Sequence, residues 1–516
     1  MALQAFFDAF QTAFTGFNVW TAIGYAIIFV IARQFVKQHG DQLRKVPRVG
    51  MDPGWFSMSK ARRNFLAYGP ELIEEGYTKF KHSMFRVQTN DMERLIISTS
   101  FIPELSRLPE ETLSVAAGIS VRHLGKYTAL DFVDHNTIQV DACRIHLTND
   151  IDHLTPALAD ELRYGMNIDL PSDGKDWVSV NAFSVLLRLV ARSSARVFVG
   201  KPLCRDEVWL ETSIGFAGEV FLTATDIRPY PNFLRPFVAP FLKSRKRLLK
   251  RLDVAAEKIV SVMKSYREGA MDRKDMPAAL WMMDVAGKGS KEQTDPKDLA
   301  LKQLFLSLAA LHTTSTHLLQ AVYDLCANPE YVQELKKEIK DVLGDDVWGS
   351  WNNAKSLKLQ KMDSFLKESQ RVNHPGMFSF NRVVMKPTTL SDNTKIPPGT
   401  LIGVATKCIA DDPEFYENPK TFDPWRFYKL AQDASSAEEK GSTAFASTSP
   451  TSMVFGHGRR ACPGRFFAAH QLKLFLVGLL TEYEFKFPKK MDRPKNLAYG
   501  EHIVPDRAQE IAFRKI

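Results

Sequence analysis

One cysteine in the chain has surroundings that suit iron binding. Residues 455–464 read FGHGRRACPG, so Cys462 lies between glycines, with arginines before it and a mostly apolar run, residues 465–480, after it. A thiolate is a strong, soft ligand for iron. Glycines let backbone N–H groups approach the sulfur, and a helix that opens at Pro463 would place its positive end beside the thiolate. We therefore predict that Cys462 ligates iron and that Arg460 reaches an anionic carboxylate on a flat cofactor.

For an isolated cysteine, the alternative is a buried structural residue in a glycine loop. Here the whole pattern Phe-x-x-Gly-x-Arg-x-Cys-x-Gly is present, and it resembles the haem-binding loop of the cytochrome P-450 family of haem-thiolate monooxygenases. The resemblance implies haem b (iron protoporphyrin IX) as the cofactor, with Cys462 as the axial iron ligand. The residues that it places around the cofactor are Phe455, Gly456, Gly458, Arg460 and Gly464.

A second unusual stretch lies within residues 298–326, which have the pattern of a long, mostly apolar helix. Residues 309–316 read AALHTTST, and hydroxyl side chains compete for helix carbonyls, so they can distort or open a turn. This stretch is either a polar patch with satisfied bonds or a groove for O₂ and water. It resembles the P-450 motif Ala/Gly-Gly-x-Asp/Glu-Thr-Thr.

The resemblance places Thr313 at the catalytic alcohol position of that motif, and Ala309 and Ala310 in the substrate pocket. Two positions depart from the family pattern, because Ala310 replaces the usual Gly and His312 replaces the usual acid. His312 could titrate near neutral pH and relay protons, or only hydrogen-bond water. The histidine variant resembles fungal members of the family that act in terpenoid and other secondary metabolism.

Glu368 and Arg371 are spaced i, i+3, which puts both on one face of a predicted helix. Taken alone, such a pair is usually a solvated surface ion pair. It matches the family's Glu-x-x-Arg, however, and residues 422–427 (FDPWRF) resemble the family's Phe-x-Pro-x-Arg-Phe. The resemblance implies that Arg426 completes a buried Glu–Arg–Arg network that holds the cysteine loop.

Two further segments carry candidates that rest on the resemblance. Residues 374–382 form a turn that enters a strand, which the family places beside the haem, so Met377 and Phe378 would face substrate and Arg382 would pair with a propionate. Residues 141–165 have a helical pattern, and the family often carries Trp-x-x-x-Arg on a helix in this region. Arg144 is the candidate for that arginine, and an exposed helix face is the equal alternative.

The N-terminal stretch predicts a membrane anchor. Residues 9–32 contain no charged side chain, and as a helix they would extend about 36 Å, enough to span a bilayer. Basic residues follow the stretch and none precedes it, which predicts a lumenal N-terminus and a cytoplasmic body. A cleaved signal peptide would need a basic segment before the apolar one. We expect an anchor over residues 1–36 and a stiff hinge over residues 37–54.

The composition limits the class of protein. The formal net charge of +9 suits an anionic membrane surface or an acidic partner, and basic residues are not interleaved with aromatic ones, so we expect no nucleic-acid binding. The five cysteines are odd in number and far apart in sequence, which favours a reducing compartment over a disulfide framework or a zinc ribbon.

Helical patterns dominate, and strand signals occur near the N-terminus and around residues 380–405. The resemblance implies a mainly α P-450 fold with a small β-rich lobe, over residues 55–516, preceded by one transmembrane helix. It implies a monooxygenase that oxidises a lipophilic small molecule, a terpenoid of diterpenoid type in fungal secondary metabolism, with O₂. The implied electron donor is an NADPH-cytochrome reductase, with a b-type cytochrome as a second donor, at the endoplasmic reticulum membrane. The alternatives are a haem-thiolate isomerase or dehydratase, and a non-catalytic haem sensor or carrier.

Deletion of residues 1–36 should release the protein from membranes without loss of haem binding, because the body has enough apolar sequence to form its own core. Carbonate and salt extraction of membranes from cells that express both forms would measure this. A truncated protein that still resists both extractions would reveal a second integral segment.

Overall fold

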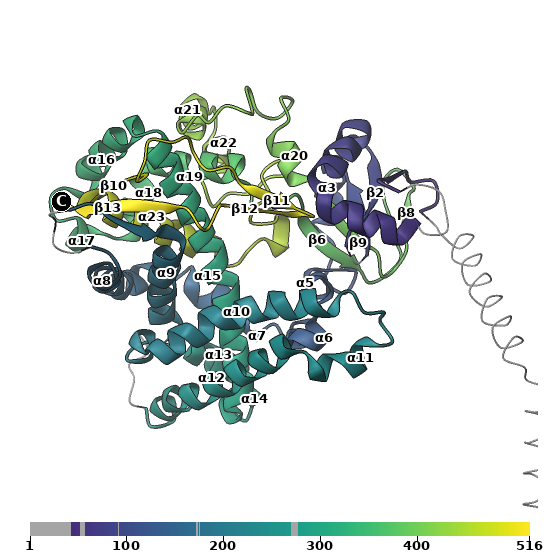
Figure 1. The fold of residues 1–516 in the computed structure, drawn as a ribbon, viewed down its shortest axis with the longest axis horizontal. Helices are drawn as coiled ribbons and strands as arrows, with labels where there is room; N and C mark the ends of the chain where they lie inside the picture. Colours follow the sequence, from purple (N-terminus) through teal and green to yellow (C-terminus); the bar gives the residue numbers. More distant parts are fainter. Residues whose placement is uncertain (1–42, 52–56, 91, 172–173, 175, 270–276) are drawn as a thin grey trace, which may run out of the picture.

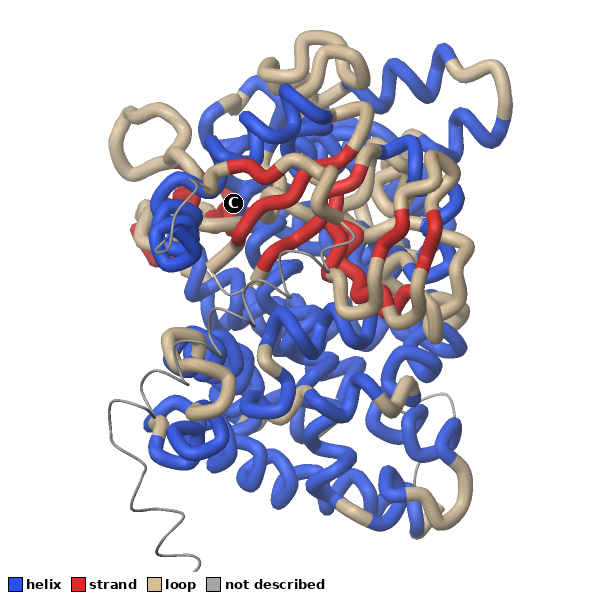
Figure 2. Tube along the Cα trace, turned by 90° about the vertical axis from the view of Figure 1, so that its right-hand side faces the viewer, coloured by secondary structure: helices blue, strands red, loops and turns tan. Residues whose placement is uncertain are grey.

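The computed structural model describes residues 43–51, 57–90, 92–171, 174, 176–269 and 277–516. The chain divides into a large helical body and a smaller lobe that carries most of the strands. Figure 1 shows that lobe, with α3 (Ser57–Phe80), at one end of the molecule. In Figure 2 the strands gather in the upper part of the view, while the lower part is helical.

The helical body is built around α15 (Pro296–Ala327), which packs against five other long helices. Asp295 caps the start of α15 by accepting a hydrogen bond from the Lys297 N–H, and Pro296 occupies the first turn. Buried residues occur on several sides of α15, as expected for a helix that lies inside the body. Its neighbours are α9 (Ala182–Phe198), α10 (Glu207–Ile227), α12 (Lys243–Arg267), α19 (Gln360–Val372) and α23 (Arg465–Glu482).

A π-helical turn, Cys143–Leu147, follows α7 and precedes α8. The other helices are shorter or more peripheral. They are α4 (Ile102–Leu105), α5 (Val115–His123), α6 (Gly125–Thr128), α7 (Ile138–Ala142), α8 (Ile151–Asp169), α11 (Arg235–Val238), α13 (Ala278–Ala286), α14 (Lys291–Thr294), α16 (Glu330–Leu343), α17 (Val347–Ser350), α18 (Asn353–Lys358), α20 (Thr406–Ala410), α21 (Arg426–Asp433) and α22 (Ala437–Ser442).

The lobe contains a six-stranded mixed sheet in the order β1-β2-β3-β9-β6-β4. Its strands are β1 (Arg48–Val49), β2 (Met84–Gln88), β3 (Glu93–Ile97), β4 (Leu113–Ser114), β6 (Ser379–Val384) and β9 (Leu401–Val404). A second sheet, β10 (Tyr483–Lys486), β13 (Glu510–Lys515) and β5 (Val178–Asn181), and the pairs β7 (Thr388–Thr389) with β8 (Lys395–Ile396) and β11 (Leu497–Tyr499) with β12 (His502–Val504) complete the strands.

The predicted mainly helical architecture with a small β-rich lobe is therefore present, and the long helix expected over residues 298–326 is α15. The predicted anchor, residues 1–36, lies outside the described residues. Within the part of the chain that the structure describes, none of the helices is both long and apolar enough to cross a bilayer. The predicted hinge is described from residue 43 to residue 51, where Arg48 and Val49 pair with β2, so this stretch is part of the lobe.

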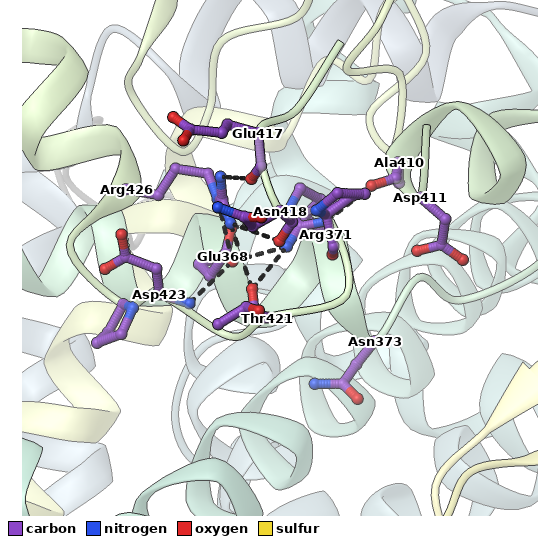
Figure 3. Close-up of polar contacts among 12 residues, drawn as sticks. Glu368, Arg371, Asn373, Ala410, Asp411, Glu417, Asn418, Thr421, Asp423 and Arg426 are labelled. Atoms are coloured by element: carbon purple, nitrogen blue, oxygen red, sulfur yellow. Dashed lines mark hydrogen bonds and ion pairs between the residues drawn. The ribbon is translucent and has the colours of Figure 1, made fainter. Parts of the chain in front are cut away.

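Two arginines, one in the same helix and one from a later part of the chain, meet around one buried carboxylate (Figure 3). Glu368, in α19, is 0% exposed. Arg371 donates two hydrogen bonds to it, Nε to Oε2 at 2.8 Å and Nη2 to Oε1 at 2.7 Å. Arg426, at the start of α21, lies on the other side with its Nε 3.1 Å from Oε2. The motif spacing predicted this cluster, and the alternative of a solvated surface pair does not apply.

The two arginines also bind the backbone between α20 and α21. Arg371 Nη1 donates to the carbonyl oxygens of Ala410 and Pro419, each at 2.7 Å. Arg426 Nη1 donates to the Glu417 carbonyl at 2.6 Å. A buried ion pair stabilises a fold only when its remaining donors are satisfied, and here they are used to fix a long loop. That loop leads through α21 and α22 to the segment that carries Cys462.

We predict that Glu368→Ala leaves two cations without their shared carboxylate and destabilises the protein by about 3–5 kcal/mol. Haem-loaded protein should then accumulate poorly, measured by yield and haem content per polypeptide. Glu417→Ala is the matched control, because the exposed Glu417 contributes only its backbone carbonyl to this cluster. Wild-type yield for Glu368→Ala would show that the network is dispensable.

Candidate functional site

The loop before Cys462 folds back on itself through two left-handed glycines. Gly456 has φ +70° and Gly458 has φ +75°. The Cys462 N–H donates to the Phe455 carbonyl at 2.7 Å, which closes the loop. A Cβ on Gly458 would lie 2.7 Å from the Cβ of Ser106, so both the backbone angle and the close contact require glycine. The loop thus holds Cys462 at its end with little conformational freedom.

The sulfur of Cys462 receives backbone hydrogen bonds from the start of α23. Burial raises the pKa of the Cys462 thiol, while backbone N–H groups of Gly464 and Arg465 and the positive charge of Arg465 act to lower it. Gly464 is the N-cap of α23, so the positive end of the helix dipole adjoins the sulfur. These are the amide donors and the helix start that the glycine-rich pattern predicted.

A buried arginine adjoins the same loop. Arg382, in β6, donates Nη2 to the His457 carbonyl at 3.1 Å, and its guanidinium lies 4.0 Å from the centre of the Phe380 ring. Its Nη1 is buried and has no hydrogen-bond partner among the described residues. Burial lowers the pKa of Arg382 to about 10, with Glu110 acting to raise it and Arg460 to lower it further. A buried N–H without an acceptor suits an anionic group that the protein itself does not supply.

Two features position Arg382. Phe380 has φ +54°, in the left-handed region that side chains with a Cβ rarely adopt, and the strand pairing shifts register between Ser379 and Arg382. Gly118, in α5, lies so close to this strand that a Cβ there would be 2.8 Å from the Asn381 carbonyl oxygen. The strand is therefore bent and held where the guanidinium meets the cysteine loop.

Arg460, predicted to reach a cofactor carboxylate, lies with its Nε 3.3 Å from Glu110 Oε2, and both side chains are partly exposed. The structure thus gives Arg460 a carboxylate from the protein itself. Glu110 was missed by the sequence reasoning, because no local pattern connects it with a loop so distant along the chain. Phe455 packs edge-to-face on Phe445, with ring centres 5.4 Å apart, and supports the start of the loop.

Thr313 and Ala309 lie one helical turn apart near the middle of α15 and form an exposed strip on it. Leu311 and Thr314 beside them are buried. The Thr313 hydroxyl donates to the Ala309 carbonyl at 2.8 Å. α15 is continuous through this stretch, so of the two alternatives the structure does not show a distorted or opened turn. The hydroxyl groups of Thr313 and Ser315 donate to carbonyls of the preceding turn, as in the polar-patch alternative. Ala310 is partly buried against the main core.

His312 lies between α15 and α10, edge-to-face with Phe221 at 6.5 Å between ring centres. Burial lowers the pKa of His312 to about 4, and the charge of Arg507 lowers it further. The imidazole is therefore neutral at physiological pH. Of the two roles left open for His312, the lowered pKa disfavours a proton relay that titrates near neutral pH, because burial outweighs the ordinary pKa of histidine.

Three other predicted residues lie away from the cysteine loop's donors. Arg144 is exposed in the π-helical turn and lies 3.6 Å from Asp141, as in the exposed-face alternative. Met377 and Phe378 are 1% and 8% exposed in a hydrophobic cluster of the lobe with Phe65. They have almost no open surface with which to meet a substrate, so we do not retain them as pocket residues.

The family model for Cytochrome P450 matches residues 169–508, which include the cysteine loop and the Glu–Arg–Arg network. The chain belongs to the cytochrome P450 family. It is accordingly a cytochrome P450 monooxygenase, an enzyme class that carries a haem iron. We therefore interpret the features of the cysteine loop described above as parts of one cofactor site.

Several fungal proteins are similar to this P450 over nearly the whole chain. Cytochrome P450 monooxygenase olcJ of Penicillium canescens is 37% identical over 508 residues, covering 97% of this chain and 94% of the relative. Cytochrome P450 monooxygenase paxP of Penicillium paxilli is 37% identical, covering 91% and 90%. Ent-kaurene oxidase P450-4 of Gibberella fujikuroi is 35% identical, covering 91% and 92%.

Among solved structures, retinoic acid-bound cyanobacterial CYP120A1 has a TM-score of 0.66, with 15% identity, covering 91% of this chain and 99% of that one. At this identity the likeness supports the fold. The side chains present fit a haem, because Cys462 offers a sulfur with backbone donors and Arg382 has a buried N–H with no acceptor in the described part of the chain. We expect these two residues to hold the iron and an anionic edge of the cofactor, respectively.

We predict that Cys462→Ser abolishes the long-wavelength absorption band of the reduced, carbon monoxide-bound P450, because a neutral hydroxyl cannot replace the electron donation of a thiolate. Cys326→Ser, at the far end of α15, should keep the band and serves as the control. A Cys462→Ser protein that keeps it would shift the search to Cys143, Cys204, Cys326 and Cys408.

Proposed function

We propose that this P450 inserts one oxygen atom of O₂ into a C–H bond of a terpenoid, and that the terpenoid is a diterpenoid of fungal secondary metabolism. The relative from Gibberella fujikuroi is named an ent-kaurene oxidase, and ent-kaurene is a diterpene hydrocarbon. The similarity extends over more than nine-tenths of both chains. It supports a lipophilic, polycyclic substrate for this enzyme.

The observation that carries the oxygen-activating role is the exposed strip of Ala309 and Thr313 in the middle of α15. Bound haem b would supply the oxygen-activating chemistry. Because the Thr313 hydroxyl donates its proton to the Ala309 carbonyl, its oxygen keeps lone pairs that can accept a hydrogen bond. Thr313 can therefore accept a hydrogen bond from a water on the side of α15 where the haem would bind. Neutral His312 would contribute packing against Phe221 and no titrating proton.

The reaction consumes the substrate, O₂, two electrons and two protons, and releases the hydroxylated product and water. We propose an NADPH-cytochrome reductase as the electron donor, with a b-type cytochrome as a second donor. A haem-thiolate isomerase or dehydratase, or a haem sensor, would need no such supply. Turnover that depends on the reductase distinguishes the monooxygenase from these alternatives, and the presence of Thr313 supports the monooxygenase.

We also propose that residues 1–36 anchor the enzyme in the endoplasmic reticulum membrane with its body in the cytoplasm. The segment between α10 and α12, which includes α11 (Figure 1), exposes Phe233, Phe237 and Phe241 by 72%, 71% and 77%. The basic start of α12 follows at once, with the sequence KSRKR in residues 243–247. Apolar side chains beside basic ones suit the surface of an anionic membrane, which supports this placement.

The proposed function is tested with microsomes that contain the enzyme and a reductase. Addition of ent-kaurene and related diterpenes should give a high-spin spectral shift and an oxidised product that requires both NADPH and O₂. If a spectral shift appears and product forms equally well without reductase, the enzyme is instead a haem-thiolate isomerase or dehydratase.

In the same assay we predict that Thr313→Ala still binds haem and substrate but loses coupling, so that NADPH is consumed and peroxide is released with little product. The methyl side chain of alanine cannot make the hydrogen bond that the Thr313 hydroxyl makes. Thr313→Ser, which restores the hydroxyl, should recover most of the product per NADPH. Full coupling in Thr313→Ala would contradict the role given to this residue.

A further inference from the structure

Buried polar side chains connect α15 with α19. His317, Gln320 and Asp324 recur on one face of α15 at spacings of three and four residues. Ser369, in α19, donates its hydroxyl to Asp324 Oδ2 at 2.6 Å, and Asn373 Nδ2 donates to the same oxygen at 3.1 Å. Two packed helices would ordinarily meet through apolar side chains, so this row of polar contacts calls for a specific role.

His317 is the member of this row nearest to Thr313. It lies one helical turn after Thr313, and its Nδ1 is 2.9 Å from the Thr313 carbonyl oxygen. A carbonyl only accepts hydrogen bonds, so Nδ1 carries the proton. Burial lowers the pKa of His317, which favours the neutral ring. Nε2 is then a free acceptor, and Gln370 Nε2 donates to it at 3.1 Å.

Gln370 lies in the turn of α19 that is already fixed by other contacts. It is buried, and it stands between Glu368 and Arg371, whose ion pairs hold the loop leading toward Cys462. A continuous series of contacts therefore runs from the Thr313 backbone through the His317 ring and the Gln370 amide to α19.

We propose that His317 is a positioning residue for Thr313. Through its hydrogen bond with Gln370, it fixes the axial position and the rotation of this part of α15 relative to α19. Apolar contacts between helices tolerate small slides, whereas the hydrogen bond between the partly buried His317 ring and the buried Gln370 amide is made in one register only. A slide of α15 would move the Thr313 hydroxyl away from the cofactor side without unfolding the protein. This inference rests on the role proposed above for Thr313.

The experiment separates positioning from stability by replacing both partners. His317→Leu alone leaves the Gln370 amide buried without its acceptor and should lower both thermal stability and product per NADPH. The double variant His317→Leu/Gln370→Leu removes both polar groups and should recover most of the stability, since paired apolar replacement is close to neutral. Product per NADPH should stay about two- to tenfold below wild type, the range that one lost hydrogen bond accounts for.

Ser369→Ala is the matched control, because it removes a hydrogen bond between the same two helices at the Asp324 end of the row. It should lower stability and leave product per NADPH unchanged. A double variant with wild-type product per NADPH overturns the inference. If that protein does not accumulate, Gln370→Met decides in its place, because it keeps the side-chain length and loses the amide: reduced coupling supports the inference and wild-type coupling overturns it.

Thr313→Ala, measured alongside, tells the two failures apart. An uncoupled Thr313→Ala with a fully coupled double variant rejects only the role of His317. A fully coupled Thr313→Ala rejects the role of Thr313 itself, and with it the reason to position that residue.

Discussion

The buried carboxylate of Glu368 is the interaction on which the site depends. It is removed from water completely, which is unfavourable unless its charge is matched, and Arg371 and Arg426 match it from two directions. Their remaining donors bind backbone carbonyls, so one charge cluster organises a segment with little regular structure. The cysteine loop is the continuation of that segment. Ion pairing elsewhere in the chain thus fixes the segment that leads to Cys462, the residue predicted to ligate iron.

The predictions that succeeded concern residues whose chemistry requires a partner. The Glu–Arg–Arg cluster followed from the family resemblance, because the spacing of Glu368 and Arg371 alone favoured a surface pair. The amides near Cys462 followed from the glycine-rich pattern, and the long helix α15 followed from its apolar pattern. The mainly helical fold with a small β-rich lobe followed from apolar periodicity together with the family resemblance.

The predictions that failed concern properties created by distant segments. Nothing near Arg460 in sequence indicates that Glu110 lies beside it, and the strand pattern could not say which side Met377 and Phe378 face. The pKa of His312 depends on its burial between α15 and α10, which no single helix pattern specifies. The hydroxyl-rich turn stays regular, with Thr313 and Ser315 bonded within their own helix, an outcome that was one of two open alternatives.

Phe380 illustrates a limit on improving such a protein by general rules. A non-glycine residue in the left-handed region costs about 1–2 kcal/mol, so a survey of backbone angles would nominate this position for glycine. The same ring, however, lies against the Arg382 guanidinium, and glycine would remove that surface. Phe380 is also only 4% exposed and belongs to a hydrophobic cluster of the lobe, so loss of its side chain would cost about 3–5 kcal/mol, more than the gain in conformational energy. A substitution chosen from the backbone angle alone would therefore destabilise the protein at this residue.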